Sequence, residues 1–474
     1  MVLGRLKVKD DKVVDIDNND APVLLRGAAI GGWMNMENFI TGYAGHEREH
    51  RAALLDVLGK DNYDYFFDEL LGHFFTEADA RYFASLGLNC IRIPFNYQHF
   101  EDDMNPRVLK PEGFKHLDRV IELCAQANIY TILDMHAVPG GQNPDWHSDN
   151  PTNHAAFWDH KDFQDRTIWL WKELAHHYKD HSCVAGYNPL NEPADPEYTR
   201  LATFYDRIEH EIRATDPDHI LWLDGNTFAM EWKGFTHILP NCVYSLHDYS
   251  TMGFPTGDRF KGTEEQHSRL EQQFLRKCEF MRLHGCPIWN GEFGPVYANP
   301  NDDDGGGDDG ADFPTINEER IALLGAQLQI YARYDTHWSI WLYKDIGLQG
   351  MVHTAPHSPW NTLIQPFLQK KRATQADAWG KVPSAEVDAV INPLVDWLDT
   401  CTAGIKTMYP PVWDTRRQVT RLINEGLLSK ALAREFAELF AGKTLEELSE
   451  LAASFNFENC VQREVLNRTL QQAA

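Results

Sequence analysis

Eight short apolar runs, separated by amphipathic stretches, constrain the fold of this 474-residue chain most strongly. Each run is apolar almost to its C-terminal end, which is typical of a strand buried on both faces of a sheet. The runs cover residues 23–32, 90–95, 130–136, 184–192, 219–225, 243–249, 286–294 and 337–344. The stretches between them repeat apolar residues three and four positions apart, as helices do when one face packs on a core. These helical patterns cover residues 76–86, 114–127, 163–178, 200–214, 265–283 and 318–334.

Strands that alternate with helices indicate βαβ units and a parallel sheet. Eight such units are the number in a closed (β/α)₈ barrel, and a doubly wound open sheet is the alternative. Polar and aromatic residues follow the ends of many different runs here. A barrel collects such residues at one shared mouth, whereas an open sheet concentrates them at a switch point. We therefore predict an α/β fold, a (β/α)₈ TIM barrel.

The pattern changes after residue 344. No strand-like run occurs between residues 366 and 474, and helical patterns cover 386–397, 416–427, 431–440 and 444–455. We predict that residues 1–365 form the barrel with a short N-terminal lead-in. Residues 366–474 then supply the last barrel helix and a C-terminal α-helical extension. This extension is expected to pack on the barrel as a cap, and a contact between two copies of the chain is the alternative.

One segment, residues 301–312, consists almost entirely of Gly and Asp. It lacks the ligand spacing and the closing Glu of an EF-hand calcium loop. We predict a solvated loop.

The charge balance and the motifs exclude several function classes. Asp and Glu number 70 against 44 Lys and Arg, a net charge of −26, so basic patches for nucleic acid are not expected. No apolar run approaches the ~18 residues of a membrane-spanning helix, and the N-terminal stretch lacks the apolar core of a secretory signal. The eight cysteines form no CxxC pair, and no glycine-rich nucleotide motif follows a predicted strand. We expect a cytoplasmic protein without membrane insertion, cofactor or metal.

Two glutamates end predicted strands on opposite sides of the barrel. Glu192 lies at the end of the fourth run and Glu292 at the end of the seventh. Charged groups are seldom buried without a partner or a task. Glycoside hydrolysis needs two opposed carboxyl groups, one to protonate the leaving oxygen and one to attack the anomeric carbon. This pair therefore predicts a glycosidase.

Taken in chain order, the strand-end residues resemble the motif set of glycoside hydrolase family 5 over about residues 22–360. The resemblance is carried by Arg92, Asn191, Glu192, His247, Tyr249, Glu292 and Trp341. The segments LRGAAIGGW (25–33) and LDMHAVPGGQN (133–143) are similar to the fungal exo-β-1,3-glucanase branch and its β-glucosidase relatives.

The resemblance implies a role for each residue. Glu192 would be the general acid/base, with a raised pKa in the free enzyme, and Glu292 the ionised nucleophile. Arg92 would lie beneath Glu292, and Tyr249 would hydrogen-bond to it. Asn191 would bind the sugar 2-hydroxyl.

For three further residues, ordinary core packing is the alternative to a role in binding. The resemblance implies that His136 and His247 bind hydroxyls or orient the carboxylates, and that Trp341 stacks under the sugar.

The implied activity is retaining hydrolysis of β-glucosidic bonds, exo-acting on small β-glucosides or β-gluco-oligosaccharides, without a cofactor. An endo-β-glucanase, a β-mannanase or mannosidase, and a sugar-binding barrel without catalysis remain as alternatives.

A zinc metallopeptidase is a further alternative, because His46-Glu47-Arg48-Glu49-His50 matches the HExxH signature. The segment is strongly charged, as a solvated helix would be. The third ligand that zinc needs has only Glu69 and His73 as candidates, both by position alone. This alternative is therefore disfavoured.

Overall fold

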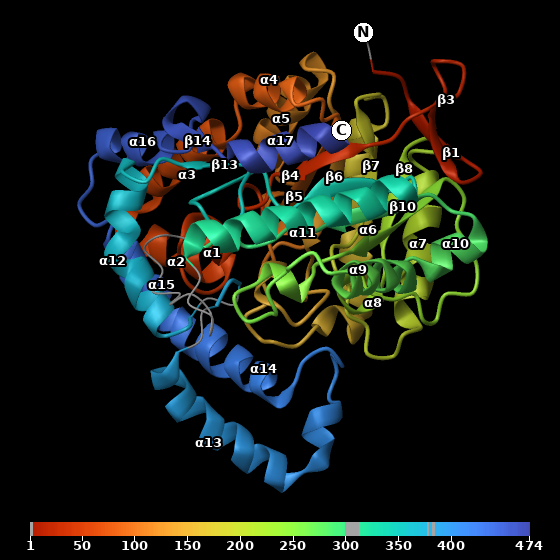
Figure 1. Cartoon of the computed structure of the whole chain (residues 1–474). Helices are drawn as coiled ribbons and strands as arrows, with labels where there is room; N and C mark the ends of the chain where they lie inside the picture. The colour runs from red at the N-terminus through yellow and green to blue at the C-terminus, as the bar shows by residue number, and fades with distance from the viewer. Residues whose placement is uncertain (1–2, 299–311, 377–378, 382–383) are drawn as a thin grey trace.

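Eight parallel strands close into a barrel in the computed structural model, which describes residues 3–298, 312–376, 379–381 and 384–474 (Figure 1). Going around the barrel, the strand order is β4-β5-β6-β7-β8-β9-β10-β11, and β11 pairs with β4. The strands are β4 Arg26–Ala29, β5 Cys90–Asn96, β6 Tyr130–Ala137, β7 Val184–Asn188, β8 Ile220–Asp224, β9 Cys242–His247, β10 Ile288–Glu292 and β11 His337–Ile340. The predicted (β/α)₈ fold is confirmed: each of the eight apolar runs contains a strand, and β5, β6 and β9 extend one residue beyond their runs.

Helices between the strands surround the barrel, as the amphipathic stretches predict. They are α4 Glu77–Ser85, α5 Phe114–Gln126, α6 Lys161–Tyr178, α7 Arg200–Arg213, α9 Glu264–Lys277, α10 Glu279–His284, α11 Phe313–Arg333 and α12 Pro359–Ala373. In α5, Leu117, Val120, Ile121 and Cys124 are buried, three and four residues apart. This spacing puts one apolar stripe against the strands.

The barrel interior is filled in layers below the mouth. Trp222 contacts Trp289 edge to face at 5.1 Å and His337 at 5.8 Å. The guanidinium of Arg92 lies over the Trp289 ring at 5.5 Å. An antiparallel sheet packs beneath this layer, with Leu6 and Val13 buried against it; its strands are β1 Leu6–Lys9, β2 Lys12–Asp15 and β3 Ala21–Pro22. The floor of the barrel is therefore closed.

The segment between β4 and α4 adds three helices to the barrel: α1 Asn38–Thr41, α2 Glu47–Leu58 and α3 Lys60–Phe74. The HExxH residues lie at the start of α2, where Glu47 accepts from the backbone N–H of Met36 and pairs with Arg51. The His50 ring stacks on Tyr43 at 4.1 Å. Within the described part of the chain, no cluster of potential metal ligands includes His46 or His50. These residues hold α2 in place.

The C-terminal stretch is mostly helical, but the expectation that it holds no strand is wrong. β14 Cys460–Gln462 pairs antiparallel with β13 Val352–Thr354, which in turn pairs with β12 Lys344–Asp345. A three-residue strand is too short for a visible alternation pattern. The remaining elements are α13 Ala385–Cys401, α14 Thr415–Thr420, a π-helical stretch Arg421–Leu428, α15 Ser429–Glu438, α16 Leu445–Ala453 and α17 Glu464–Ala473.

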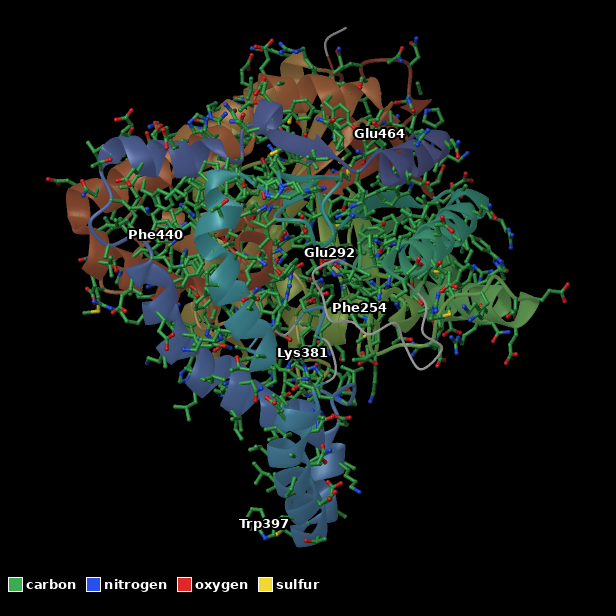
Figure 2. The ribbon with its side chains drawn as sticks, turned by 60° about the vertical axis from the view of Figure 1, so that its left-hand side comes forward. Phe254, Glu292, Lys381, Trp397, Phe440 and Glu464 are labelled. Carbon is green, nitrogen blue, oxygen red and sulfur yellow. The ribbon has the colours of Figure 1, made fainter. Side chains whose placement is uncertain are left out.

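The last part of the chain covers the helices inserted after β4. α15 packs on α2, and α16 packs on α3. The predicted division at residues 365/366 falls inside α12. Residues 385–428 project from this body as an arm, with Trp397 near its tip (Figure 2).

Two sequence expectations concern other segments. The Gly/Asp segment 301–312 lies outside the described residues, except for Asp312, which caps α11 by accepting from the Thr315 N–H. Among the helices that the structure describes, none combines the length and the apolarity that crossing a bilayer requires.

Candidate active site

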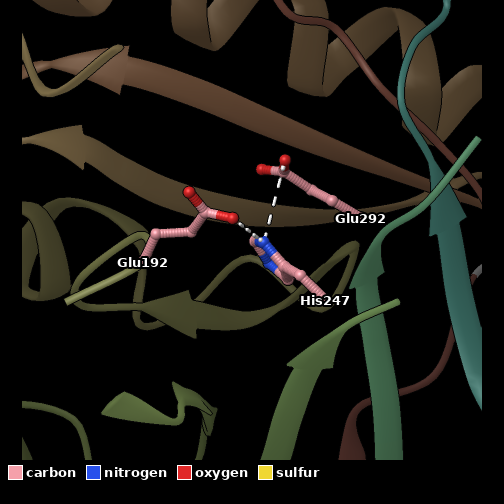
Figure 3. Close-up of side chains that lie close together, drawn as sticks. All are labelled: Glu192, His247 and Glu292. Carbon is pink, nitrogen blue, oxygen red and sulfur yellow. Dashed lines mark hydrogen bonds and ion pairs between the residues drawn. The ribbon is translucent and has the colours of Figure 1, made fainter. Parts of the chain in front are cut away.

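Glu192, His247 and Glu292 converge at the C-terminal mouth of the barrel (Figure 3). Glu292 is the last residue of β10, His247 ends β9, and Glu192 lies beyond the end of β7. One side-chain ligand atom from each of the three lies within 4.8 Å of the others. Both carboxyl groups are nearly buried, at 9% and 5% exposed for Glu192 and Glu292. The structure thus brings together two glutamates that are 100 residues apart in the sequence.

The carboxylate of Glu292 is held from both sides. Arg92, which is fully buried, donates from Nη1 to Glu292 Oε1, and the Tyr249 hydroxyl donates to Oε2 at 3.0 Å. Arg92 also donates to Asn191 Oδ1 at 2.7 Å and pairs with Asp134 at 3.0 Å. A guanidinium in contact with a carboxylate favours the ionised form. These contacts therefore fix the Glu292 carboxyl in one orientation.

Glu192 contacts two imidazoles. His247 Nδ1 lies 2.6 Å from Oε1, and His147 Nε2 lies 3.1 Å from Oε2. The backbone of Glu192 is left-handed, with φ 47°, and its N–H donates to Asp224 at 3.0 Å. A residue other than glycine is strained when its backbone is left-handed, and such strained residues cluster at functional sites.

The direction of the Glu192 pKa differs from the raised value that the resemblance implies. Burial raises the pKa of this carboxyl, but hydrogen bonds from His147 and His247 outweigh burial and lower it. Burial lowers the pKa of both imidazoles, and the surrounding carboxylates outweigh this and raise it. The acidic proton of the unliganded site therefore resides on the imidazoles. The sequence reasoning did not include His147.

His136 and Trp341 form one wall beside Glu292. Their rings stack at 5.3 Å, and His136 Nδ1 lies 2.7 Å from Asp134. Burial keeps the pKa of His136 well below its ordinary value, so the ring is neutral. With Nδ1–H directed at Asp134, Nε2 accepts from the Asn191 side chain at 3.1 Å. This chain of contacts fixes Asn191, whose side chain bridges His136 and Arg92.

A pocket of about 290 Å³ lies over these residues, and it includes groups that the sequence reasoning missed. Among them are Glu37, Asp145, Trp146, His147, Phe228, Met230, Trp379, Trp413 and Arg417. Within the described structure, Oε1 of the buried Glu37 has no hydrogen-bond partner, and it lies 3.6 Å from His136 Nε2. Burial and the nearby Glu292 and Glu192 raise the pKa of Glu37. Such a carboxyl can bind a sugar hydroxyl.

The missed residues lie in loops and in the C-terminal arm, whereas the sequence reasoning searched the strand ends. Only His147 gave a usable signal, because it follows closely on the polar segment 133–143.

The three converging groups also have the donor atoms of a cation site. However, Arg92 already occupies one oxygen of Glu292 with a permanent positive charge. Proton transfer and nucleophilic attack suit this arrangement better, because the two imidazoles hold the proton next to Glu192.

The comparisons with known proteins agree with this geometry. Residues 66–346 match the family model described as "Cellulase (glycosyl hydrolase family 5)". A "Beta-xylosidase" of Phanerodontia chrysosporium is 54% identical over 100% of this chain and 98% of its own length. A "Probable glucan 1,3-beta-glucosidase A" of Emericella nidulans is 29% identical over 55% of this chain and 63% of its own. Among solved structures, an endogalactoceramidase covers 78% of each chain with a TM-score of 0.53 and 17% identity, a likeness in fold alone. Both the family match and the full-length relative show that the chain belongs to glycoside hydrolase family 5.

Proposed function

We propose that the protein is a retaining, exo-acting β-glycosidase that removes a xylosyl or glucosyl residue from small β-glycosides. One observation carries the proposal: an oxygen of Glu192 and an oxygen of Glu292 lie within 4.8 Å of each other. Retaining glycosidases hold their carboxyl groups about 5–5.5 Å apart, and inverting enzymes about 6.5–9.5 Å apart to admit a water. The separation supports direct attack by a carboxylate.

In the first step, Glu292 attacks the anomeric carbon while Glu192 gives its proton to the leaving oxygen. The bond to the leaving group breaks, and an ester forms between the sugar and Glu292. Arg92 and Tyr249 hold Glu292 in line for this attack. In the proposed mechanism Asn191, which contacts Arg92 and His136, binds the 2-hydroxyl, a contact that strengthens in the transition state.

In the second step, Glu192 takes a proton from water, which attacks the same carbon and releases the sugar with retained configuration. His147 and His247 supply the first proton to Glu192 and receive the second from it. Their raised pKa keeps that proton in the site.

Two observations support exo action on a small substrate. The pocket, at about 290 Å³, is at the small end of the range for sites that enclose one small molecule. Buried polar side chains, Glu37 and His136, are among its lining residues and can bind the hydroxyls of a single sugar. A long glucan chain would need an open groove instead.

The choice of sugar rests on the relatives. The relative that matches this chain over its full length is named a β-xylosidase, which favours xylosides. The glucan 1,3-β-glucosidase favours glucosides, the sugar that the sequence resemblance implies. Xylose and glucose share the configuration of their ring hydroxyls and differ only in the hydroxymethyl group at C5, so one pocket can accept both.

Product analysis tests the proposal. The protein is incubated with nitrophenyl β-xyloside and β-glucoside and with xylo-, gluco- and manno-oligosaccharides, and the products are separated by chromatography. We expect stepwise release of one monosaccharide. NMR should show that the β-anomer is formed first. Glu292→Gln should abolish release and retain a cooperative unfolding transition, because the nucleophile is lost while Arg92 keeps its buried pair with Asp134. Internal cleavage would instead indicate an endoglucanase or mannanase, and release of the α-anomer first would contradict the retaining route.

A further inference from the structure

An aromatic pair from two distant parts of the chain lines one edge of the pocket. Trp413, just before α14 in the arm, stacks on Phe228 from the loop after β8, with ring centroids 5.8 Å apart and planes at 24°. Both side chains are only partly buried, so part of each ring remains accessible. The family match ends at residue 346, so Trp413 lies outside it.

This pair lies on the side of Glu192. Phe228 contacts the His147 ring at 6.3 Å, and His147 contacts the carboxyl of Glu192. The wall formed by His136 and Trp341 lies with Glu37, and its His136 ring contacts His147 at 5.8 Å. In the proposed reaction Glu192 protonates the leaving oxygen, so the leaving group must lie on its side. The pair therefore borders the leaving-group half of the pocket.

A strained turn presents Phe228 to this half. Thr227, Phe228 and Ala229 all have left-handed backbones, with φ of 53°, 61° and 57°. A left-handed backbone is unfavourable for a residue with a side chain, so three in succession need support from their surroundings. The Thr227 hydroxyl bonds to Glu231 and lies 3.1 Å from the Tyr409 hydroxyl, which belongs to the arm. The arm thus supports the turn as well as the ring that stacks on it.

The arm is also tied to the residues around Glu192 by charge. Arg417 and Arg421 place their guanidinium groups over the Trp413 ring, at 5.4 and 5.6 Å. Both pair with Asp145 at 3.3 Å, and Asp145 lies 3.8 Å from His147 Nδ1. Arg421 also donates to the Pro144 carbonyl at 2.8 Å. These contacts fix Trp413 in relation to Glu192.

From these contacts we infer that the C-terminal arm builds the leaving-group site, and that this site takes a leaving group with a flat apolar ring, such as an aryl aglycone. The inference rests on the proposed function. The polar lining residues on this side, Asp145, His147 and Arg417, are engaged in ion pairs, and the pocket lining also includes the apolar side chains of Trp146, Phe228, Met230 and Trp413. Arg417 directs its two terminal nitrogens at Asp145 and Glu425. A second sugar would find few partners for its hydroxyls here, whereas an aryl ring can stack.

The test compares substrates that have the same sugar and different leaving groups. The kcat/KM values are measured for a phenyl β-glycoside and for the β-glycosyl fluoride, which has no ring to stack. Trp413→Ala should lower the ratio of phenyl glycoside to fluoride by roughly three- to tenfold, the size of one aromatic stack. Trp413→Phe should retain most of the ratio. Trp397→Ala is the matched control, because this tryptophan lies in the same arm but is 60% exposed near its tip.

An unchanged ratio in Trp413→Ala would overturn the inference. An equal or larger loss of kcat/KM on the corresponding disaccharide would also overturn it, because Trp413 and Phe228 would then bind a sugar. Binding to Glu292→Gln by calorimetry gives a readout that does not depend on turnover. Phenyl β-xyloside should bind more tightly than methyl β-xyloside, and adding Trp413→Ala should remove the advantage. If the wild type turned over no glycoside, the proposed function would fail, and this binding comparison would still decide the inference.

Discussion

At the scale of single residues, the site separates two glutamates by what surrounds them. Glu292 contacts a guanidinium and a phenol, which favour a fixed, ionised carboxylate. Glu192 contacts two imidazoles that can carry a proton and return it. The two residues are of the same type, so it is their different partners that suit Glu292 to attack and Glu192 to proton transfer.

The loss of kcat/KM on removing the Glu192 carboxyl should depend on the leaving group of the substrate. We expect Glu192→Ala to lower kcat/KM by about 10²–10⁴-fold on alkyl glycosides, the usual contribution of general acid catalysis. The loss should be much smaller on dinitrophenyl glycosides, because a good leaving group needs little protonation. Steady-state kinetics on the two series, with the exposed Glu438→Ala as control, checks this. Equal losses on both series would exclude Glu192 as the acid.

The two imidazoles also predict the pH dependence. Because the pKa of His147 and of His247 is raised above the ordinary value of about 6.5, the site keeps its proton past that pH. We expect kcat/KM on alkyl glycosides to be maintained up to this raised pKa and to fall as the pH rises through it. The profile on dinitrophenyl glycosides should be flatter on the basic side. A basic limb at or below the ordinary imidazole value would contradict the assignment.

At the scale of elements, the arm is joined to the barrel by buried charges. Glu425, in the π-helical stretch, is 1% exposed and pairs with Arg417, Arg421 and Lys381. Breaking a buried ion pair leaves uncompensated charge, which costs far more than losing an exposed pair. The junction therefore depends on Glu425.

Glu425→Gln should accordingly lower the free energy of unfolding by about 3 kcal/mol. Urea denaturation measures this. Glu438→Gln, which loses an exposed pair with Arg434, should change it by less than about 0.5 kcal/mol. Similar values for the two variants would mean that the charges around Glu425 are solvated.

The sequence predicts the barrel well because each strand is an apolar run that ends in polar residues. The exact ends of the strands are predicted less well: the fourth run reaches Glu192, but β7 ends at Asn188. Polar residues after a strand mark the mouth, so Glu192, Glu292 and their near neighbours could be proposed. Glu37 and Trp413 could not, because they reach the pocket from a loop and from the arm. Their proximity is set by packing between distant segments, which no local pattern records.

At the scale of the whole molecule, the C-terminal stretch covers apolar surface that the barrel needs buried. Trp360 packs against Phe440 and Phe455, with ring centroids at 5.8 and 5.1 Å. The buried Lys344 donates to the Phe455 carbonyl and pairs with Asp79. The barrel and the C-terminal stretch thus share one hydrophobic core.

A chain that ends at residue 384 should therefore fail to fold. We expect it to be insoluble or to unfold without a cooperative transition, as measured by circular dichroism during heating. A chain that ends at residue 471, which loses only the end of α17, should behave as the full chain does. A soluble, cooperatively unfolding product of the shorter truncation would show that the barrel is an independent domain.

The arm also has a consequence for synthesis. A ribosome releases the chain from its N-terminus onward, so Glu192 and Glu292 emerge long before Trp413 and Glu425. Because a chain without its C-terminal stretch is expected not to fold, the two carboxyl groups should not come together before the residues that share their core have been made. We therefore expect the active site to form only after the end of the message has been translated.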